Sequence, residues 1–178
     1  MTNANKQLVL RSLEGLFNDG NMAVARETCA ADVALFTHAR PEPFRGPAGV
    51  IEFAQMIRTA FPDSRLTMHD LIAEDGCVAA RYTLRGTHRG SLAGLPATGH
   101  EVAVDIHELF HIEAGRLQEV WLKIDAMQVL QQLGVMPASE SLPRPLIMMS
   151  RARGRIAAMR ERMQRVAGAR LGRPVSGP

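Results

Sequence analysis

The feature that most limits how this chain can fold is the run 102–112, which reads VAVDIHELFHI. Side chains on a β-strand point to alternating faces. One face of this run therefore collects Val102, Val104, Ile106, Glu108, Phe110 and Ile112, and the other collects Asp105, His107, Leu109 and His111. An apolar face of this length predicts a strand that covers a core or the wall of a pocket.

Glu108 is the exception on that apolar face. Burying a carboxylate costs several kcal/mol unless it is paired, hydrogen-bonded or protonated. An apolar pocket raises the pKa of a carboxyl group, and proteins use this to make a general acid or base. Two structural interpretations stand beside the catalytic one: a buried Glu paired with a neighbouring Arg, and a strand end at which the alternation breaks.

Composition indicates one folded domain with some chain left over. The 178 residues are 46% hydrophobic and 22% charged, and aromatic residues are scarce, so a pocket would be lined by aliphatic side chains and Met. Cys29 and Cys77 have no metal-ligand spacing, and Met1 to Lys6 does not resemble a signal peptide. We therefore expect free thiols in a cytoplasmic protein. No apolar run approaches the length of a membrane span.

The remaining pattern predicts an α+β fold. Helices are expected at 5–29, with a turn at 18–21, and at 49–60 and 126–133; strands are expected at 32–38, 65–73, 77–87, 100–112 and 116–124. Three prolines predict a loop at 40–47. Helices followed by an antiparallel meander are typical of a curved sheet that wraps around the helices. We expect this domain to occupy residues 1–137.

The C-terminal part differs sharply in charge. Residues 141–178 carry nine Arg and one acidic residue, whereas residues 1–140 carry 12 basic and 17 acidic residues. The pattern predicts a Pro/Ser linker at 138–145, an Arg-rich amphipathic helix at 146–171 and a disordered tail at 172–178. The favoured role of the helix is to pack on its own protein or across a dimer, or to dock to an acidic protein partner. An anionic membrane surface is an alternative, and nucleic acid is disfavoured because a single helix gives no base-reading context.

Several short strings, in their order and spacing, resemble the SnoaL-like polyketide cyclase (ester cyclase) family. They are AFPD at 60–63, VAARY at 78–82, GTHRG at 86–90, GLPATG at 94–99, GRLQEVW at 115–121 and QLG at 132–134. The resemblance covers about residues 5–137. It implies a cone-shaped α+β fold with one deep pocket, homodimers through the outer face of the sheet, and ring closure on polyketide substrates without metal or organic cofactor. Fold alone does not carry function.

The sequence departs from the aldol cyclases of that family. The resemblance implies a His on strand 102–112 and an Asp with a nearby His on strand 116–124. The corresponding positions here are Glu108, Val120 and Leu122. The aldol carboxylate is therefore missing, so the resemblance favours oxa-cyclisation, isomerisation or cycloaddition over aldol closure.

Four residues are candidates for catalysis. Tyr82, the only Tyr, falls on the apolar face of strand 77–87 with Glu108, where its hydroxyl can donate to a substrate carbonyl or simply satisfy the core. His38, beside the loop, is either a general base or a surface residue. Asp125 follows the last strand, and its role as an N-cap explains it fully. The expected substrate contacts are Phe36, Ile106, Phe110, Val120 and Leu122.

Two hypotheses about function follow. The first is a cofactor-independent cyclase or isomerase with Glu108 as acid and base, acting on an apolar polyketide-like molecule. The second is a non-catalytic small-molecule-binding or scaffold protein whose Arg-rich helix docks to a partner. No metal is expected, because His107 and His111 have no third ligand at a recognisable spacing.

Overall fold

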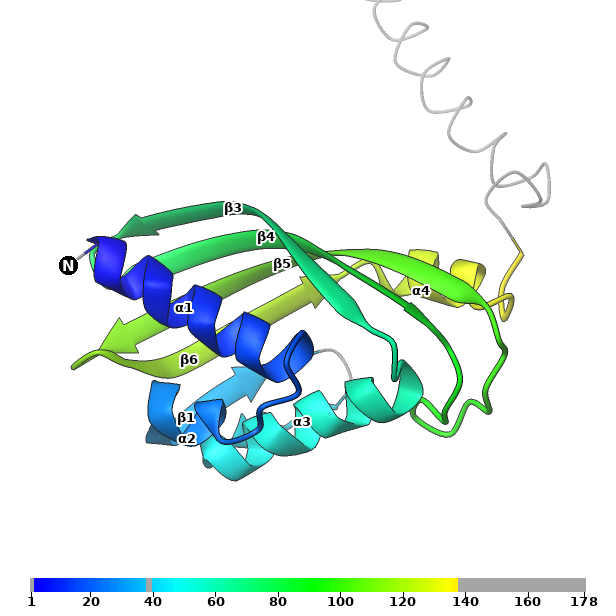
Figure 1. The fold of residues 1–178 in the computed structure, drawn as a ribbon, viewed down its shortest axis with the longest axis horizontal. Coiled ribbons are helices and arrows are strands. Elements are labelled where there is room, and N and C mark those ends of the chain that lie inside the picture. The colour runs from blue at the N-terminus through cyan, green and yellow to red at the C-terminus, as the bar shows by residue number, and fades with distance from the viewer. Residues whose placement is uncertain (1, 38–39, 138–178) are drawn as a thin grey trace, which may run out of the picture. The chain divides into compact units, whose positions relative to one another are not determined.

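The computed structural model of the protein describes residues 2–37 and 40–137. The strands are β1 (Cys29–Phe36), β2 (Phe44–Arg45), β3 (Arg65–Glu74), β4 (Cys77–Thr87), β5 (Glu101–Glu113) and β6 (Arg116–Ile124). They form one curved, unclosed sheet in the order β2-β1-β6-β5-β4-β3 (Figure 1). The predictions for the linker, the Arg-rich helix and the tail concern residues outside the described part.

Four helices accompany the sheet: α1 (Thr2–Phe17), α2 (Val24–Thr28), α3 (Gly46–Ala60) and α4 (Ala126–Gln132). The helix α1 packs against β3, and α3 packs against β1, so both cover the same side of the sheet (Figure 1). The core lies between them and the inner faces of the strands. Along β5 burial alternates from residue to residue, as its sequence predicts, and Glu108 is buried with its apolar neighbours.

The predicted α+β cone is confirmed, and the strands 77–87 and 116–124 have the predicted bounds. Two details differ. The predicted loop 40–47 contains the short strand β2 and the start of α3, because Pro47 stands in the first turn of a helix, where no N–H is needed. The sheet is also mixed, since β1 pairs with β6 in the parallel direction.

The outer face of the sheet carries a continuous apolar row. Cross-strand pairing joins Ile72 to Ala79, Ala79 to Leu109, Leu109 to Trp121, and Trp121 to Phe36. Ile72 is 68% exposed, Leu109 39% and Trp121 38%. Such a row, which crosses five strands, is larger than the isolated apolar residues common on protein surfaces.

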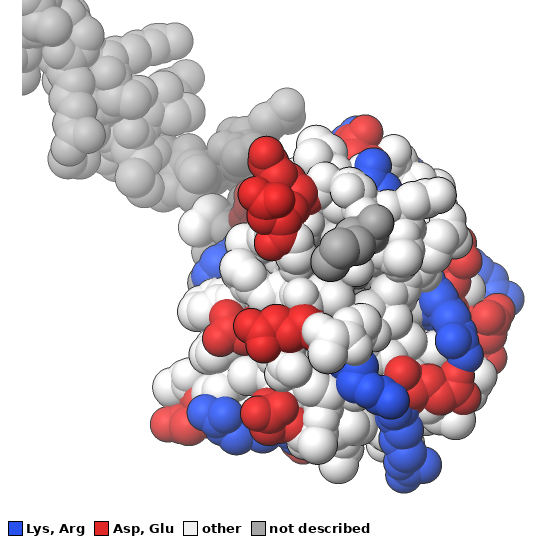
Figure 2. Space-filling view, turned by 90° about the vertical axis from the view of Figure 1, so that its left-hand side faces the viewer, with Lys and Arg blue, Asp and Glu red and all other residues white. Residues whose placement is uncertain are grey.

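Charges are spread over the surface of the domain. On the face shown in Figure 2, acidic and basic side chains are interspersed among uncharged residues. On the outer face of the sheet, Arg81 forms an ion pair with Asp70, with 2.6 Å between the guanidinium and carboxylate groups. Among the described residues, no helix is long and apolar enough to cross a membrane.

The connection between β4 and β5 is fastened to the end of α3. The N–H groups of Arg89 and Gly90 donate to the Ala60 carbonyl at 2.9 and 3.1 Å. The His88 ring is fully buried against Phe61, and its Nδ1 accepts from the Thr98 N–H at 3.2 Å. This anchoring fixes the position of the segment that follows, which reaches the interior of the cone.

The close packing at Gly90 allows the attachment of the β4–β5 connection to α3 to be tested by measuring stability. A Cβ at Gly90 would lie 2.1 Å from the Thr59 carbonyl oxygen, whereas nothing lies within 4 Å of a Cβ at Gly94. We expect Gly90→Ala to lower the free energy of unfolding by about 3 kcal/mol through overpacking. Gly94→Ala should cost about 1 kcal/mol, because Gly94 has a positive φ. Urea unfolding of both variants checks this, and equal losses would contradict it.

Candidate active site

The cone contains a partly open cavity of about 240 Å³ between the sheet and the helices. Inner-face residues of β4, β5 and β6 form one wall, among them Leu84, Val104, Ile106 and Leu122. The opposite wall comes from α3, with Phe53, Met56 and Ile57, while Leu92 and Ala93 of the β4–β5 connection complete it. Among the described lining residues, Thr37 and Tyr82 have side chains that carry a polar oxygen. The cavity is suited to a small, mostly apolar molecule.

Tyr82 and Glu108 meet beside this cavity. The Tyr82 ring lines it, and the Tyr82 hydroxyl donates a hydrogen bond of 2.9 Å to Glu108 Oε2. The pairing of β4 with β5 explains the contact: Tyr82 lies opposite Ile106, one inward position away from Glu108. Both side chains are buried, at 1% and 6% exposure. No Arg or Lys among the described residues pairs with Glu108.

Burial controls the acid–base properties of this pair. Loss of solvation raises the pKa of Glu108 from 4.5 to about 7, although the hydrogen bond from Tyr82 acts to lower it. Burial also raises the pKa of Tyr82 well above its ordinary value, and the nearby Glu108 charge raises it further. Glu108 can therefore gain or lose a proton near neutral pH, while Tyr82 stays protonated. A group that titrates near the working pH is what general acid–base catalysis needs.

Glu108 itself lines a second, smaller chamber of about 30 Å³. Ser12, Cys29, Phe110 and Val120 are among its other lining residues. Phe17 and Phe53 line both spaces, so the chamber and the larger cavity are neighbours. The carboxyl group thus stands behind Tyr82 as seen from the cavity.

The structure separates the predicted substrate contacts into three groups. Ile106 and Leu122 line the larger cavity, whereas Phe110 and Val120 line the chamber beside Glu108. Phe36 belongs to neither lining. Its ring stacks on Trp121, with centroids 4.0 Å apart, at the outer face of the sheet.

Two predicted catalytic residues stand apart from the Tyr82–Glu108 pair. Asp125 is exposed and caps α4, since its carboxylate accepts from the Gln128 N–H at 3.0 Å. Its neighbours Ile124 and Ala126 line the cavity, so Asp125 lies near the rim. His38 lies outside the described residues, and its role as a base stays a prediction.

Other residues of the site were not identified from the sequence. Ser12 and Cys29 reach the small chamber from α1 and β1, and Leu92 reaches the cavity from the β4–β5 connection. The apolar stripe of the predicted helix 49–60 was the available signal for the α3 wall. Ser12 interrupts the apolar stripe of its helix in the way that Glu108 interrupts that of its strand. Among the described residues, no group of three or more His, Cys, Asp or Glu side chains is placed to hold a metal ion.

Comparison with known proteins supports the same architecture. A model of SnoaL-like polyketide cyclases matches residues 7–133. A candidate SnoaL-like polyketide cyclase from Jannaschia sp. CCS1 is 24% identical, with a TM-score of 0.71, over 77% of this chain and 96% of that one. AclR from Streptomyces galilaeus, described as a candidate hydroxylase, is 24% identical, with a TM-score of 0.66 and coverages of 77% and 100%.

IdmH from Streptomyces antibioticus, a candidate polyketide cyclase, is 27% identical, with a TM-score of 0.63 over 74% of this chain and 99% of that one. No curated protein matches the chain.

The raised pKa of Glu108 predicts a specific dependence of stability on pH. The unfolded chain releases this proton near pH 4.5, whereas the folded protein keeps it until about pH 7. Between these values the folded state binds one proton more, so its stability falls as the pH rises. We expect Glu108 to cost roughly 3 kcal/mol of unfolding free energy across this window.

Urea unfolding of the wild type and Glu108→Gln at a series of pH values measures that cost. Every other titrating group is common to both proteins, so the difference between their curves isolates Glu108. The wild type should lose stability relative to the variant as the pH rises from 4.5 through 7. Parallel curves would show that the carboxyl group titrates normally.

Proposed function

Because the chain belongs to the SnoaL-like polyketide cyclase family, we propose that it is a cyclase or isomerase acting on a small, mostly apolar polyketide-like molecule. The observation that carries the proposal is the buried Tyr82–Glu108 hydrogen bond beside an apolar cavity of about 240 Å³. The 27% identity to IdmH, described as a candidate polyketide cyclase, supports this reaction class. The chemistry assigned below to Glu108 and Tyr82 requires no cofactor.

In this proposal Tyr82 carries protons between the substrate and Glu108. When Glu108 is protonated, it donates to Tyr82 Oη and frees the Tyr82 hydroxyl proton to face the cavity. A substrate carbonyl or alkoxide oxygen takes the Tyr82 proton as Tyr82 takes the proton of Glu108. The reverse movement removes a proton and restores the acid. Tyr82 never carries a charge, which agrees with its strongly raised pKa.

The cavity wall supplies the rest of the catalysis. Aliphatic and aromatic side chains from β5, β6 and α3 can hold a flexible apolar chain in a folded conformation. Fixing two reacting positions of one molecule near each other lowers the entropic part of the barrier to ring closure. Val120 and Leu122 contribute no acid or base, so this proposal favours oxa-cyclisation, isomerisation or cycloaddition over aldol closure.

A second candidate function is ligand binding without turnover. It is favoured by the position of Glu108, whose side chain lines the small chamber and not the larger cavity. In that case the Tyr82–Glu108 pair is a buried polar contact of the core, and the cavity holds a small apolar ligand. Docking of the Arg-rich segment 146–171 to an acidic partner stays a prediction from the sequence.

Substitution of the pair separates the two functions. Both Glu108→Gln and Tyr82→Phe should lower turnover of a polyketide-like substrate by about 10²- to 10⁴-fold, the usual contribution of general acid–base catalysis. Gln can hydrogen-bond to Tyr82 but cannot transfer its proton. Glu113→Gln, an exposed carboxyl on the same strand, is the matched control and should be fully active. Turnover of Glu108→Gln at the wild-type rate would support simple binding.

We also propose that two copies of the chain associate through the outer face of the sheet. The row formed by Ile72, Ala79, Leu109 and Trp121 is apolar and lies in a shallow depression. A two-fold axis through such a row places apolar side chains of one copy against those of the other, which makes it self-complementary.

Oligomeric state tests this interface. The wild type should elute with light-scattering mass twice the 19.5 kDa of one chain. Leu109→Asp should give the single-chain mass, because a charge at the centre of the row would be buried without a partner. A matched exposed substitution outside the row, Glu113→Asp, should leave the mass unchanged. A wild-type protein of single-chain mass would refute the proposal.

A further inference from the structure

The second oxygen of Glu108 points to a binding site in the small chamber. Tyr82 donates to Oε2, and no hydrogen bond within the described residues reaches Oε1. The Glu108 side chain is nevertheless 94% buried, with 6% exposure, and lines the small chamber. Oε1 is not one of the fully sealed side-chain atoms without a partner, which among the described residues are Ser64 Oγ and His88 Nε2, so a water molecule can reach it. A carboxylate oxygen that water reaches in apolar surroundings can take its hydrogen bond from that water.

The size of the chamber limits what the donor can be. Its volume is about 30 Å³. A water molecule needs a space of roughly 10–15 Å³ and two or more polar partners. The chamber meets the first condition and is too small for an organic ligand. Ser12 and Cys29 are the polar side chains that share its lining with Glu108.

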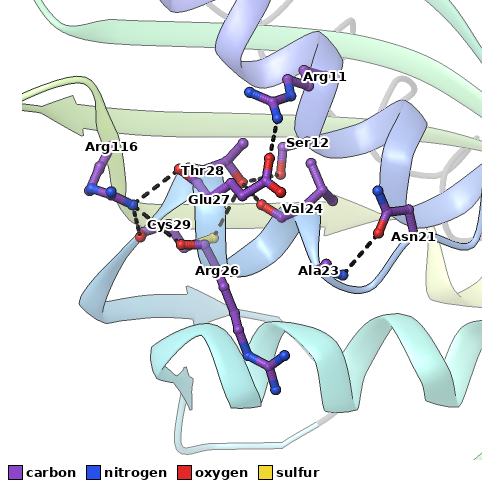
Figure 3. A network of polar contacts seen from close by, with 10 residues as sticks. All are labelled: Arg11, Ser12, Asn21, Ala23, Val24, Arg26, Glu27, Thr28, Cys29 and Arg116. Carbon is purple, nitrogen blue, oxygen red and sulfur yellow. Dashed lines mark hydrogen bonds and ion pairs between the residues drawn. The ribbon is translucent and has the colours of Figure 1, made fainter.

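Neighbouring polar groups fix the position of the Ser12 hydroxyl beside the chamber. It is buried on α1 at 3% exposure, and its Oγ lies 3.3 Å from Thr28 Oγ1 (Figure 3). Thr28 Oγ1 also lies 2.8 Å from the Val24 carbonyl, which can accept but not donate. A hydroxyl group has one proton to donate. The Thr28 hydroxyl donates it to the Val24 carbonyl, because this contact is the shorter of the two. Ser12 Oγ therefore keeps a lone pair for a further donor.

We propose that the chamber binds a single water molecule, which donates one proton to Glu108 Oε1 and the other to Ser12 Oγ. Ser12 is then a positioning residue that acts on Glu108 through this water. The water stabilises the carboxylate form, whose other oxygen is bound by Tyr82. The catalytic role of this water rests on the proposed function. In that mechanism the water stabilises the negative charge on Glu108 after Glu108 has given up its proton.

A pair of matched substitutions tests the site. Val120 lines the chamber, and Val104 lines the larger cavity, both from inward positions of neighbouring strands. Val120→Ile adds one methylene to the chamber and displaces the water, whereas Val104→Ile adds the same group elsewhere. The readout is the pKa of Glu108, followed by NMR of protein labelled with ¹³C at the Glu side-chain carboxyl carbon.

We expect Val120→Ile to raise the Glu108 pKa by about one to two units, since a hydrogen bond to a charged group is lost. Val104→Ile should leave it unchanged. Ser12→Ala, which keeps the space but removes one anchor, should raise it by a smaller amount. Equal Glu108 pKa values in the wild type, Val120→Ile and Ser12→Ala would overturn the proposal, as would a high-resolution crystal structure without water density at Oε1.

This experiment can fail independently of the proposed function. The NMR titration requires no substrate, so it decides on the water even if the protein proves to be a binding protein. If Val120→Ile shifts the pKa and Glu108→Gln keeps full turnover, the water site stands and the catalytic role of Glu108 is wrong. If Glu108→Gln is inactive and the pKa values are equal, Glu108 acts without this water.

Discussion

The hydrogen bond from Tyr82 to Glu108 is the contact on which the interior of this cone depends. A carboxyl group has been placed on the inner face of β5 among apolar side chains, and the hydroxyl of Tyr82 reaches one of its oxygens. Because no cation compensates it among the described residues, the group is most stable when protonated. The same burial that weakens the fold at high pH moves the titration of Glu108 into the range that acid–base chemistry requires.

The local sequence pattern was sufficient to predict the inward-facing residues of an element where one of its faces is buried along its whole length. Alternation along 77–87 and 102–112 placed Tyr82 and Glu108 on the inner face, and the structure confirms both placements. The N-cap at Asp125 followed from the residue type and the turn before α4, and its bond to Gln128 confirms it. In each case the deciding interaction lies within one strand or within three residues of chain.

Contacts between segments that are distant in the sequence could not be predicted from these local patterns. The parallel pairing of β1 with β6 joins residues more than 80 positions apart, and it turns Leu35 inward beside Val120 and Phe36 outward beside Trp121. Alternation alone does not say which face of that strand is the inner one, and the expectation that Phe36 contacts substrate assumed the opposite orientation. The participation of Ser12 in the chamber was missed for the same reason, since it depends on how α1 packs over the strands.

The arrangement of two spaces relates the chemistry to the shape of the fold. The larger cavity has a mostly apolar wall, with polar groups on Thr37 and Tyr82 among its described lining residues, so the proposed function gives it the task of holding and folding an apolar substrate. The small chamber shares Phe17 and Phe53 with the larger cavity and is lined by Glu108. Tyr82 lines the larger cavity and donates a hydrogen bond to Glu108. In the proposed mechanism a proton crosses from one space to the other through Tyr82, and the substrate and the ionised carboxylate do not share the same cavity. Because Glu108 lines the small chamber and not the larger cavity, the domain can contain both a mostly apolar cavity and a carboxyl group that titrates near neutral pH.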